Sequence, residues 1–239
     1  MRGWWREIAG LVLPLPCAGC GRPRAGLCDG CARALGAVPR RVRPAPEPSG
    51  LPVVHAAAPY ENAVRAVLLA HKERGVLGLT GALGGALAGA VRAGAGQAGG
   101  ARPVLLVPVP SARRATAARG HDPVRRIAVA AGAELRRGGV RAGVLAVLRQ
   151  QRAVADQAGL GARERQANLS GALAVADGAA ELLVRGRVVL VDDVLTTGAS
   201  LADAARAVRA AVHAGGVGAD GLMAAVVAAS PTAFELNRN

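Results

Sequence analysis

Two adjacent carboxylates near the C-terminal end of the chain are placed where a ligand could be bound. They belong to the run VVLVDDVLTTGAS, from Val188 to Ser200. The aliphatic start of this run predicts a buried strand over 187–191 that ends at Asp192, and the pattern that follows predicts an amphipathic helix over 201–213. Ligands bind at the carboxyl ends of strands in open α/β sheets, so we expect Asp192 and Asp193 to face one.

The segment between this strand and this helix has the composition of a phosphate-binding loop. Gly198 lets the backbone approach a ligand, and the helix N-terminus supplies free N–H groups and a positive dipole end. The two aspartates suit ribose hydroxyls, directly or through Mg²⁺. Helix capping alone would explain Ser200, but not two acids, two threonines and a glycine in series. The loop is not a Walker A motif, because Gly-Lys-Ser/Thr is absent. The hydroxyl groups belong to Thr196, Thr197 and Ser200.

A second group of phosphate-binding candidates follows the apolar run over 104–109. Arginine makes bidentate contacts to phosphate oxygens, so this loop suits a pyrophosphate group. Its candidates are Ser111, Arg113, Arg114 and Arg119, with His121 nearby. His71 and Lys72 end a helix expected over 62–72. They could reach a phosphate, or they could only interact with the helix dipole.

Four cysteines, at positions 17, 20, 28 and 31, form two Cys-x₂-Cys pairs separated by seven residues. Each pair can place two thiolates on one ion, and four thiolates satisfy tetrahedral Zn²⁺. Two disulfides or four free thiols are the alternatives, and reducing conditions would disfavour disulfides. A structural zinc site leaves no open coordination position for catalysis. The predicted ligands are Cys17, Cys20, Cys28 and Cys31.

The rest of the chain alternates strand and helix patterns, which predicts an α/β fold with a mostly parallel sheet flanked by helices. We expect three parts: a four-cysteine zinc module over 1–39, a linker or extended crossing over 40–52, and the main domain over 53–239. A polar segment over 150–168 predicts a long loop. Strands are expected over 53–60, 104–109, 144–148, 172–175, 187–191 and 222–228, and helices over 62–72, 76–91, 125–135 and 201–213.

The composition favours an anionic ligand. The 239 residues carry a formal net charge of +14, and Lys72 is the only lysine. This charge suits phosphates or nucleic acid, although an arginine-rich proteome would produce it too. No stretch is long and apolar enough to predict a membrane span. The N-terminal apolar run is short and broken by prolines, so we expect a cytoplasmic protein.

These segments resemble a known class of proteins through one motif and a narrower family within that class through their combination. VDDVLTTGAS resembles the phosphoribosyl pyrophosphate (PRPP) motif of type I phosphoribosyltransferases, with Ala199 where many members carry a second glycine. With the PVPS and RGHD segments and the four cysteines, the chain resembles the ComF family, phosphoribosyltransferase-like proteins named for competence, over nearly its whole length. A further pattern, R-x-x-R, Q-x-x-L and R-x-x-N, is formed by Arg149, Arg152, Gln157, Leu160, Arg165 and Asn168.

The resemblance implies a type I phosphoribosyltransferase fold with a small N-terminal zinc-binding module. Asp192 and Asp193 would then act at the ribose and hold Mg²⁺ through PRPP. The 5′-phosphate would be bound by Thr196, Thr197, Gly198, Ala199 and Ser200, and the pyrophosphate by Ser111, Arg113, Arg114 and Arg119. A flexible loop that closes over PRPP would contain Arg149, Arg152, Gln157, Arg165 and Asn168, although these arginines also fit a solvated surface loop.

Three functions are consistent with these features. The first is transfer of a phosphoribosyl group to an unknown acceptor with release of pyrophosphate. The second is a non-catalytic PRPP-binding accessory or sensor linked to DNA uptake or nucleic-acid processing. The third, a zinc-ribbon nucleic-acid binder with a vestigial α/β domain, conflicts with the intact Asp-Asp and Thr-Thr-Gly elements. Aromatic side chains for stacking on a base are scarce, being only Trp4, Trp5, Tyr60 and Phe234.

Overall fold

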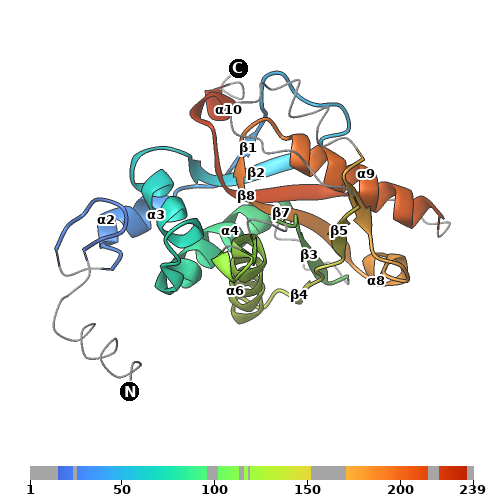
Figure 1. Cartoon of the computed structure of the whole chain (residues 1–239), viewed down its shortest axis with the longest axis horizontal. Coiled ribbons are helices and arrows are strands. Elements are labelled where there is room, and N and C mark those ends of the chain that lie inside the picture. The colour runs from blue at the N-terminus through green and yellow to red at the C-terminus, as the bar shows by residue number, and fades with distance from the viewer. Residues whose placement is uncertain are drawn as a thin grey trace.

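A six-stranded sheet forms the centre of the described structure, and five of its strands run parallel (Figure 1). The structure is a computed structural model, which describes residues 16–23, 26–95, 102–112, 116–117, 119–151, 171–214 and 221–235. The strand order is β1-β2-β8-β7-β3-β4, and only the edge strand β1 is antiparallel to its neighbour. The strands are β1 (Arg40–Val42), β2 (Val53–Pro59), β3 (Val104–Pro108), β4 (Ala142–Val144), β7 (Arg187–Leu195) and β8 (Met223–Ala229).

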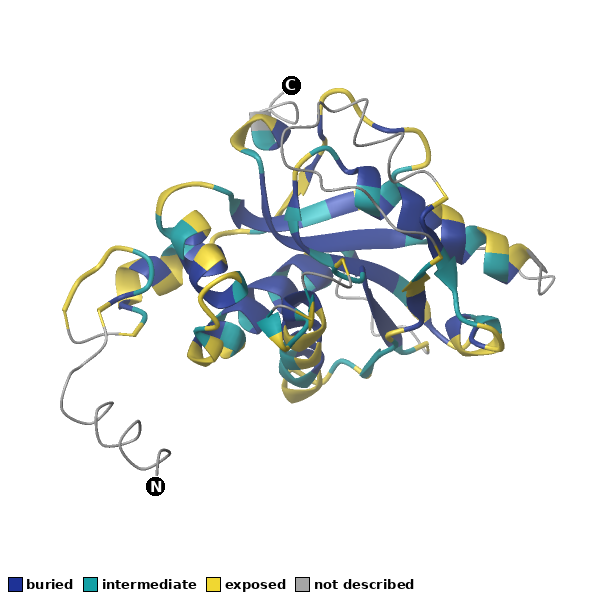
Figure 2. Cartoon of the chain, in the orientation of Figure 1, coloured by how far each residue is buried: buried dark blue, intermediate teal, exposed yellow. Residues whose placement is uncertain are grey.

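Helices cover both faces of this sheet and enclose two aliphatic cores. One core lies between the sheet and α3 (Asn62–Lys72), α4 (Thr80–Ala95) and α6 (Pro123–Arg137), with the short η1 (Leu77–Leu79) joining the first two helices. The other core lies against α8 (Ala180–Leu183), α9 (Ala199–Ala214) and α10 (Pro231–Glu235). Figure 2 shows the buried residues concentrated along the strands and on the helix sides that face them. This layered arrangement confirms the prediction of an α/β fold with a mostly parallel sheet flanked by helices.

Small residues bring the helices of the first core close together. An added Cβ at Gly84 in α4 would lie 2.5 Å from the Cβ of Ala130 in α6. Any larger residue at this position would force the two helices apart. The alanine- and glycine-rich composition of α4 therefore serves close packing, which partly offsets the scarcity of large aromatic side chains.

The connections on either side of β3 and β7 diverge. From β3 the chain passes through α6 to β4 at one edge, whereas from β7 it passes through α9 to β8 in the other direction. The boundary between β3 and β7 is therefore a topological switch point, where the loops at the carboxyl ends of the two strands separate and leave a crevice. Both predicted phosphate loops, which follow β3 and β7, begin at this boundary.

Several predicted elements differ from the observed ones. The expected strand over 144–148 is wrong: β4 ends at Val144, and β5 (Leu148–Gln150) pairs antiparallel with β6 (Leu173–Val175) in a separate two-stranded sheet. The helix expected over 76–91 is divided into η1 and α4. Of the two alternatives for 40–52, a linker or an extended strand-like crossing, the edge strand β1 with its buried Val42 fits the second. Each difference depends on pairing or packing with distant residues, which a local pattern does not record.

Candidate functional site

The acidic pair lies where β7 continues beyond its neighbour β3. Val191 of β7 pairs with Pro108, the last residue of β3, and from Asp192 onward β7 pairs only with β8. The strand therefore runs to Leu195 rather than ending at Asp192 as predicted. Among the described residues, its β3-facing edge at the two aspartates has no ladder partner. The Asp193 N–H donates to Asp192 Oδ1 at 2.8 Å, so the backbone of Asp193 fixes the orientation of the Asp192 carboxylate.

Lys72, at the last residue of α3, is the counter-ion of the acidic pair. Its Nζ lies 2.6 Å from Asp193 Oδ2, and the Asp193 side chain is only 7% exposed. Burial opposes the Lys72 charge, but the charge and hydrogen bond of Asp193, together with the charge of Asp192, outweigh it and raise the pKa of Lys72. The only lysine of the chain is thus held at the carboxyl end of β7.

The two aspartates share this counter-ion unequally. Burial, followed by the neighbouring Asp193 charge, raises the pKa of Asp192 well above the ordinary aspartate value, and the attraction of Lys72 opposes this only in part. A carboxylate in such a position is under-compensated. It will be stabilised by any ligand that brings hydroxyl donors or a cation.

The loop after β7 turns at Gly198 directly before α9 begins. Gly198 adopts φ of +78°, and an added Cβ there would lie 3.2–3.3 Å from carbons of Leu51 and Pro44. α9 begins at Ala199, whose N–H lies 3.4 Å from Thr197 Oγ1. Asn62 is the only described non-glycine residue with positive φ, so the methyl group of Ala199 is accommodated without strain.

The predicted pyrophosphate loop is described only in part. Ser111 Oγ lies 3.4 Å from Asp122 Oδ1, and this oxygen also accepts from the Arg125 N–H as the N-cap of α6. Arg119 Nε lies 3.3 Å from Glu73 Oε2, just beyond α3. The loop after β3 is therefore in contact with the helix end that carries Lys72. Arg113 and Arg114 lie outside the described residues.

Of the predicted flexible-loop residues, only Arg149 falls within the described part. It is exposed on β5, opposite Ala174 of β6. The remaining four positions, Arg152, Gln157, Arg165 and Asn168, lie outside the described residues.

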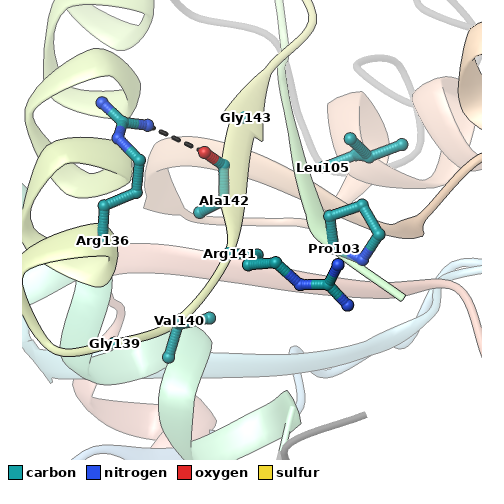
Figure 3. A pocket seen from close by; sticks show the side chains of 8 residues that line it. All are labelled: Pro103, Leu105, Arg136, Gly139, Val140, Arg141, Ala142 and Gly143. Carbon is teal, nitrogen blue, oxygen red and sulfur yellow. Dashed lines mark hydrogen bonds between the residues drawn. The ribbon is translucent and has the colours of Figure 1, made fainter. Parts of the chain in front are cut away.

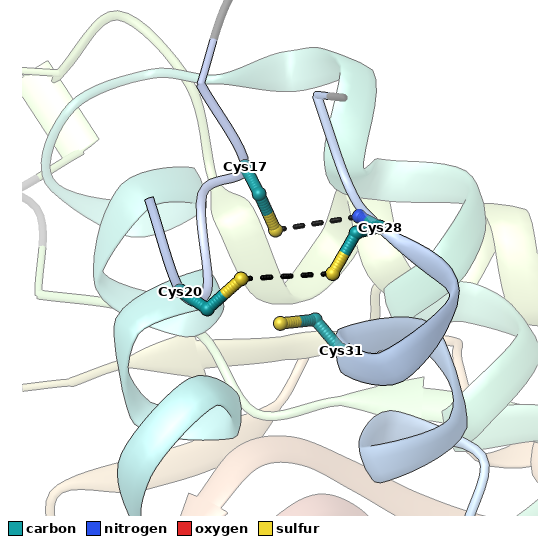
Figure 4. A group of neighbouring side chains, drawn as sticks. All are labelled: Cys17, Cys20, Cys28 and Cys31. Carbon is teal, nitrogen blue, oxygen red and sulfur yellow. Dashed lines mark hydrogen bonds between the residues drawn. The ribbon is translucent and has the colours of Figure 1, made fainter. Parts of the chain in front are cut away.

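The four cysteines converge on one point, as Figure 4 shows. Their Sγ atoms all lie within 4.8 Å of one another, and the Cys20 and Cys28 sulfurs are 3.6 Å apart. A tetrahedral zinc with Zn–S bonds of ~2.3 Å places its sulfurs about 3.8 Å apart, so the cluster could hold a metal such as zinc. All four positions are filled, which fits a structural site.

The electrostatics of the cluster also fit a cation. The Cys28 N–H, 3.3 Å from Cys17 Sγ, is the main cause that lowers the pKa of Cys17 to about 6. Burial, followed by the neighbouring thiols, raises the pKa of Cys31. Without an ion the four sulfurs cannot all ionise, whereas a dication lets them do so.

The cysteine cluster is packed against α3. An added Cβ at Gly19 would lie 2.7 Å from Cys31 Sγ and 3.2 Å from the Cβ of Ala63. The helix α2 (Asp29–Leu35), which carries Cys31, packs on α3 and α4. One end of α3 therefore contacts the cysteine cluster and the other end supplies Lys72.

A shallow hollow lies at the opposite end of the sheet (Figure 3). Its lining comes from the starts of β3 and β4, and Arg136 there donates to the Ala142 carbonyl at 2.8 Å. It contains none of the predicted site residues. The acidic pair is instead at the carboxyl ends of the strands, where the sequence places it.

Two features of this region were missed from sequence. The first is the Lys72–Asp193 ion pair, since the sequence suggested only a phosphate or the helix dipole as the partner of Lys72. The second is Asp203 in α9, a buried carboxylate that accepts from the N–H groups of Gly171 (2.9 Å) and Leu173 (2.8 Å). A polar residue on the buried side of an amphipathic helix was the available signal for Asp203.

The chain matches no protein-family profile and no curated protein. None of the helices in the described part has both the length and the apolar character needed to cross a membrane. The functional interpretation therefore depends on the geometry of the site and on the sequence motifs.

Proposed function

We propose that the chain binds PRPP at the boundary between β3 and β7 and transfers its phosphoribosyl group to an unknown acceptor, releasing pyrophosphate. The observation that carries this proposal is the acidic pair on the unpaired edge of β7, followed directly by the Gly198 turn and the start of α9. The site also lies at a topological switch point, where open α/β sheets bind their ligands.

Each part of PRPP has a chemically suitable partner. The 5′-phosphate fits the loop from Thr196 to Ser200, where backbone N–H groups and the α9 dipole favour a dianion. The ribose hydroxyls fit the under-compensated carboxylate of Asp192. The pyrophosphate fits Arg119 and Lys72 on the β3 side, where the two loops face the end of α3.

In the proposed reaction, the bond between ribose C1 and the pyrophosphate oxygen breaks, and its electron pair leaves with pyrophosphate. The acceptor then donates an electron pair to C1 and loses a proton. Positive charge develops on the ribose as the bond breaks, and Asp192 and Asp193 would stabilise it. Asp192 and Asp193 would be the residues to hold Mg²⁺, which would supply positive charge against the leaving pyrophosphate. The carboxylates are the hard oxygen ligands that this ion takes.

Calorimetric titration with PRPP, with and without Mg²⁺, tests the binding step. The variant Asp192→Asn/Asp193→Asn is expected to lose binding at least tenfold, because each substitution removes a charge from the ribose contact. The matched control is Asp177→Asn, which removes one exposed carboxylate from a turn. Equal affinity in the parent and the double variant would contradict the proposed site.

A non-catalytic PRPP-binding role is the second candidate, favoured by the net charge of +14 and the scarcity of aromatic residues for holding a base. Measuring Mg²⁺-dependent pyrophosphate release across a panel of nucleobase and amine acceptors separates the two. Binding without release for every acceptor supports the sensor or accessory role. Salt-dependent DNA binding, lost on neutralising Arg113 and Arg114, would support its nucleic-acid part.

A further inference from the structure

His71 is a buried histidine next to the site with one imidazole nitrogen left unused. It is 1% exposed, and its Nε2 lies 3.1 Å from Thr80 Oγ1. The single hydroxyl proton of Thr80 is donated to the Leu77 carbonyl at 2.7 Å, so Thr80 must accept from His71 Nε2–H. In the neutral ring, Nδ1 then carries a bare lone pair.

His121, in the loop after β3, also has one ring nitrogen that donates a hydrogen bond and one that has no partner among the described residues. Its Nδ1 lies 3.0 Å from the Arg119 carbonyl oxygen, which can only accept, so Nδ1 is the donor. Nε2 of the neutral ring is therefore the bare nitrogen.

The two rings contact each other. Their centroids are 6.2 Å apart and their planes are inclined by 77°. Both bare nitrogens are buried, and neither has a partner among the described residues; the same holds for the Arg119 Nη1 donor. A buried polar atom without a partner costs about 1–3 kcal/mol, so these three atoms, on residues linked by the ring contact and by the bond from His121 to the Arg119 carbonyl, indicate a site that is completed by something else.

The charges around the pair decide what that partner is. Burial, then the His121 ring, lowers the pKa of His71; Asp193 opposes this and Arg126 adds to it. Arg119 and Lys72 are the other cations of this region, paired with Glu73 and Asp193. A surplus of nitrogen groups beside the predicted pyrophosphate loop fits an anionic partner. As bare acceptors, however, the two rings cannot donate to it.

We propose that the His71–His121 pair is a protonatable anion subsite: it takes up one proton as it binds the pyrophosphate portion of a phosphorylated ligand. The inference rests on the proposed function, because it places the pyrophosphate beside Arg119. The added proton turns one bare nitrogen into a donor for the anion, and the unpartnered Nη1 of Arg119 offers a second donor. A second proton is opposed by the first, since the rings are in contact.

Proton uptake makes binding depend on pH with a defined sign. Burial lowers the pKa of His71, so the free protein disfavours a proton there, whereas a bound anion favours the charged form of the ring. Affinity for the anion therefore rises as pH falls, by up to about tenfold per pH unit for one proton taken up.

Two substitutions remove only the bare nitrogens. His71→Gln keeps a donor near the Nε2 position for Thr80, and His121→Asn keeps one near the Nδ1 position for the Arg119 carbonyl. His55→Gln is the matched control: His55 also has a buried Nδ1 without a described partner, but it lies in β2 beside Gly94.

The measurement is calorimetric titration of inorganic pyrophosphate with Mg²⁺ at pH 7.5, in two buffers of different ionisation enthalpy. The buffer dependence of the heat gives the number of protons taken up. The ligand's own protonation is common to all proteins and cancels in the comparison. We expect the parent and His55→Gln to take up more protons than His71→Gln and His121→Asn, by up to one per ligand, and to bind at least threefold more tightly.

The outcomes separate this inference from the proposed function. If pyrophosphate and PRPP bind but all four proteins take up the same number of protons, the subsite is wrong and the proposed function stands. If neither ligand binds the parent, the proposed function fails and the subsite fails with it. The four histidines of the chain also allow a nuclear magnetic resonance check, in which the His71 and His121 ring signals shift on pyrophosphate addition and the His55 signal does not.

Discussion

Replacing Lys72 by methionine tests the contact that joins α3 to the acidic pair. Methionine keeps most of the apolar stem but removes the ammonium group, so Asp193 is left with its charge and without its counter-ion. Exposed ion pairs contribute about 0.2–1 kcal/mol, whereas removing one partner of a buried pair costs about 3–5 kcal/mol. Asp193 is 7% exposed and Lys72 33%, which places this pair between the two cases. We expect a loss of about 2–3 kcal/mol.

A loss of this size lowers the Tm of a domain of this length by roughly 5–10 °C. Urea denaturation and calorimetry of Lys72→Met, Asp193→Asn and the double variant form a thermodynamic cycle. Asparagine needs no counter-ion, so the double variant should recover much of the stability lost in Lys72→Met. The control Arg74→Met removes an exposed positive charge two residues away and should change stability by less than about 0.5 kcal/mol.

The pH dependence of the cycle has a definite sign. The pKa of Lys72 is raised in the folded state, so its contribution is fully present below the usual lysine value of 10.5 and is lost only as pH rises through the folded-state value. The titration of Lys72 itself should therefore not reduce the coupling at any pH below 10.5. The argument is refuted if Lys72→Met costs no more than Arg74→Met, or if the double variant is as unstable as Lys72→Met.

Three other predictions concern the acidic pair, the turn and the metal. Because the pKa of Asp192 is raised in the folded state, its ionisation opposes folding. Stability should therefore fall as the pH rises from the pKa of Asp192 in the unfolded chain through its pKa in the folded protein. Asp192→Asn should therefore stabilise the ligand-free protein at neutral pH by about 1 kcal/mol while weakening PRPP binding, as calorimetry and titration would show; a lower Tm would contradict this. Gly198→Ala should cost about 1–2 kcal/mol and weaken PRPP binding, because the residue has positive φ and its new methyl group meets Leu51; unchanged denaturation and affinity would exclude this role. Cys31→Ser should lower the zinc content from one ion per chain, measured by elemental analysis, and reduce the Tm; full zinc content would rule out the four-cysteine site.

The sequence predicted those features that depend on local pattern. The helix over 62–72 follows from helical spacing of apolar residues and the strand at 104–109 from a continuous apolar run, and both are observed with ends correct to within one residue. The cysteine cluster was predictable because ligand spacing determines how thiolates meet at one ion. The Gly198 turn was predictable because only a few residue types suit it.

What the sequence did not reveal depends on contacts between distant residues. Lys72 and Asp193 are 121 residues apart, and nothing near either one indicates the other. The His71–His121 contact is hidden for the same reason. The division of the expected strand over 144–148 into β4 and β5 follows from two different pairing partners, β3 and β6. Side-chain patterns report which face is buried, but not which strand will be the neighbour.

The position of β8 has a consequence for how the chain acquires this structure. This strand is the last of the sheet to be synthesised, yet it lies between β2 and β7, and all seven of its residues are buried. Until residues 223–229 have left the ribosome, the β1–β2 pair and the β7–β3–β4 group have no strand to join them. Folding of the sheet is therefore completed only after residues 223–229 have been made, and a chain that stops before β8 leaves two apolar strand edges open to aggregation.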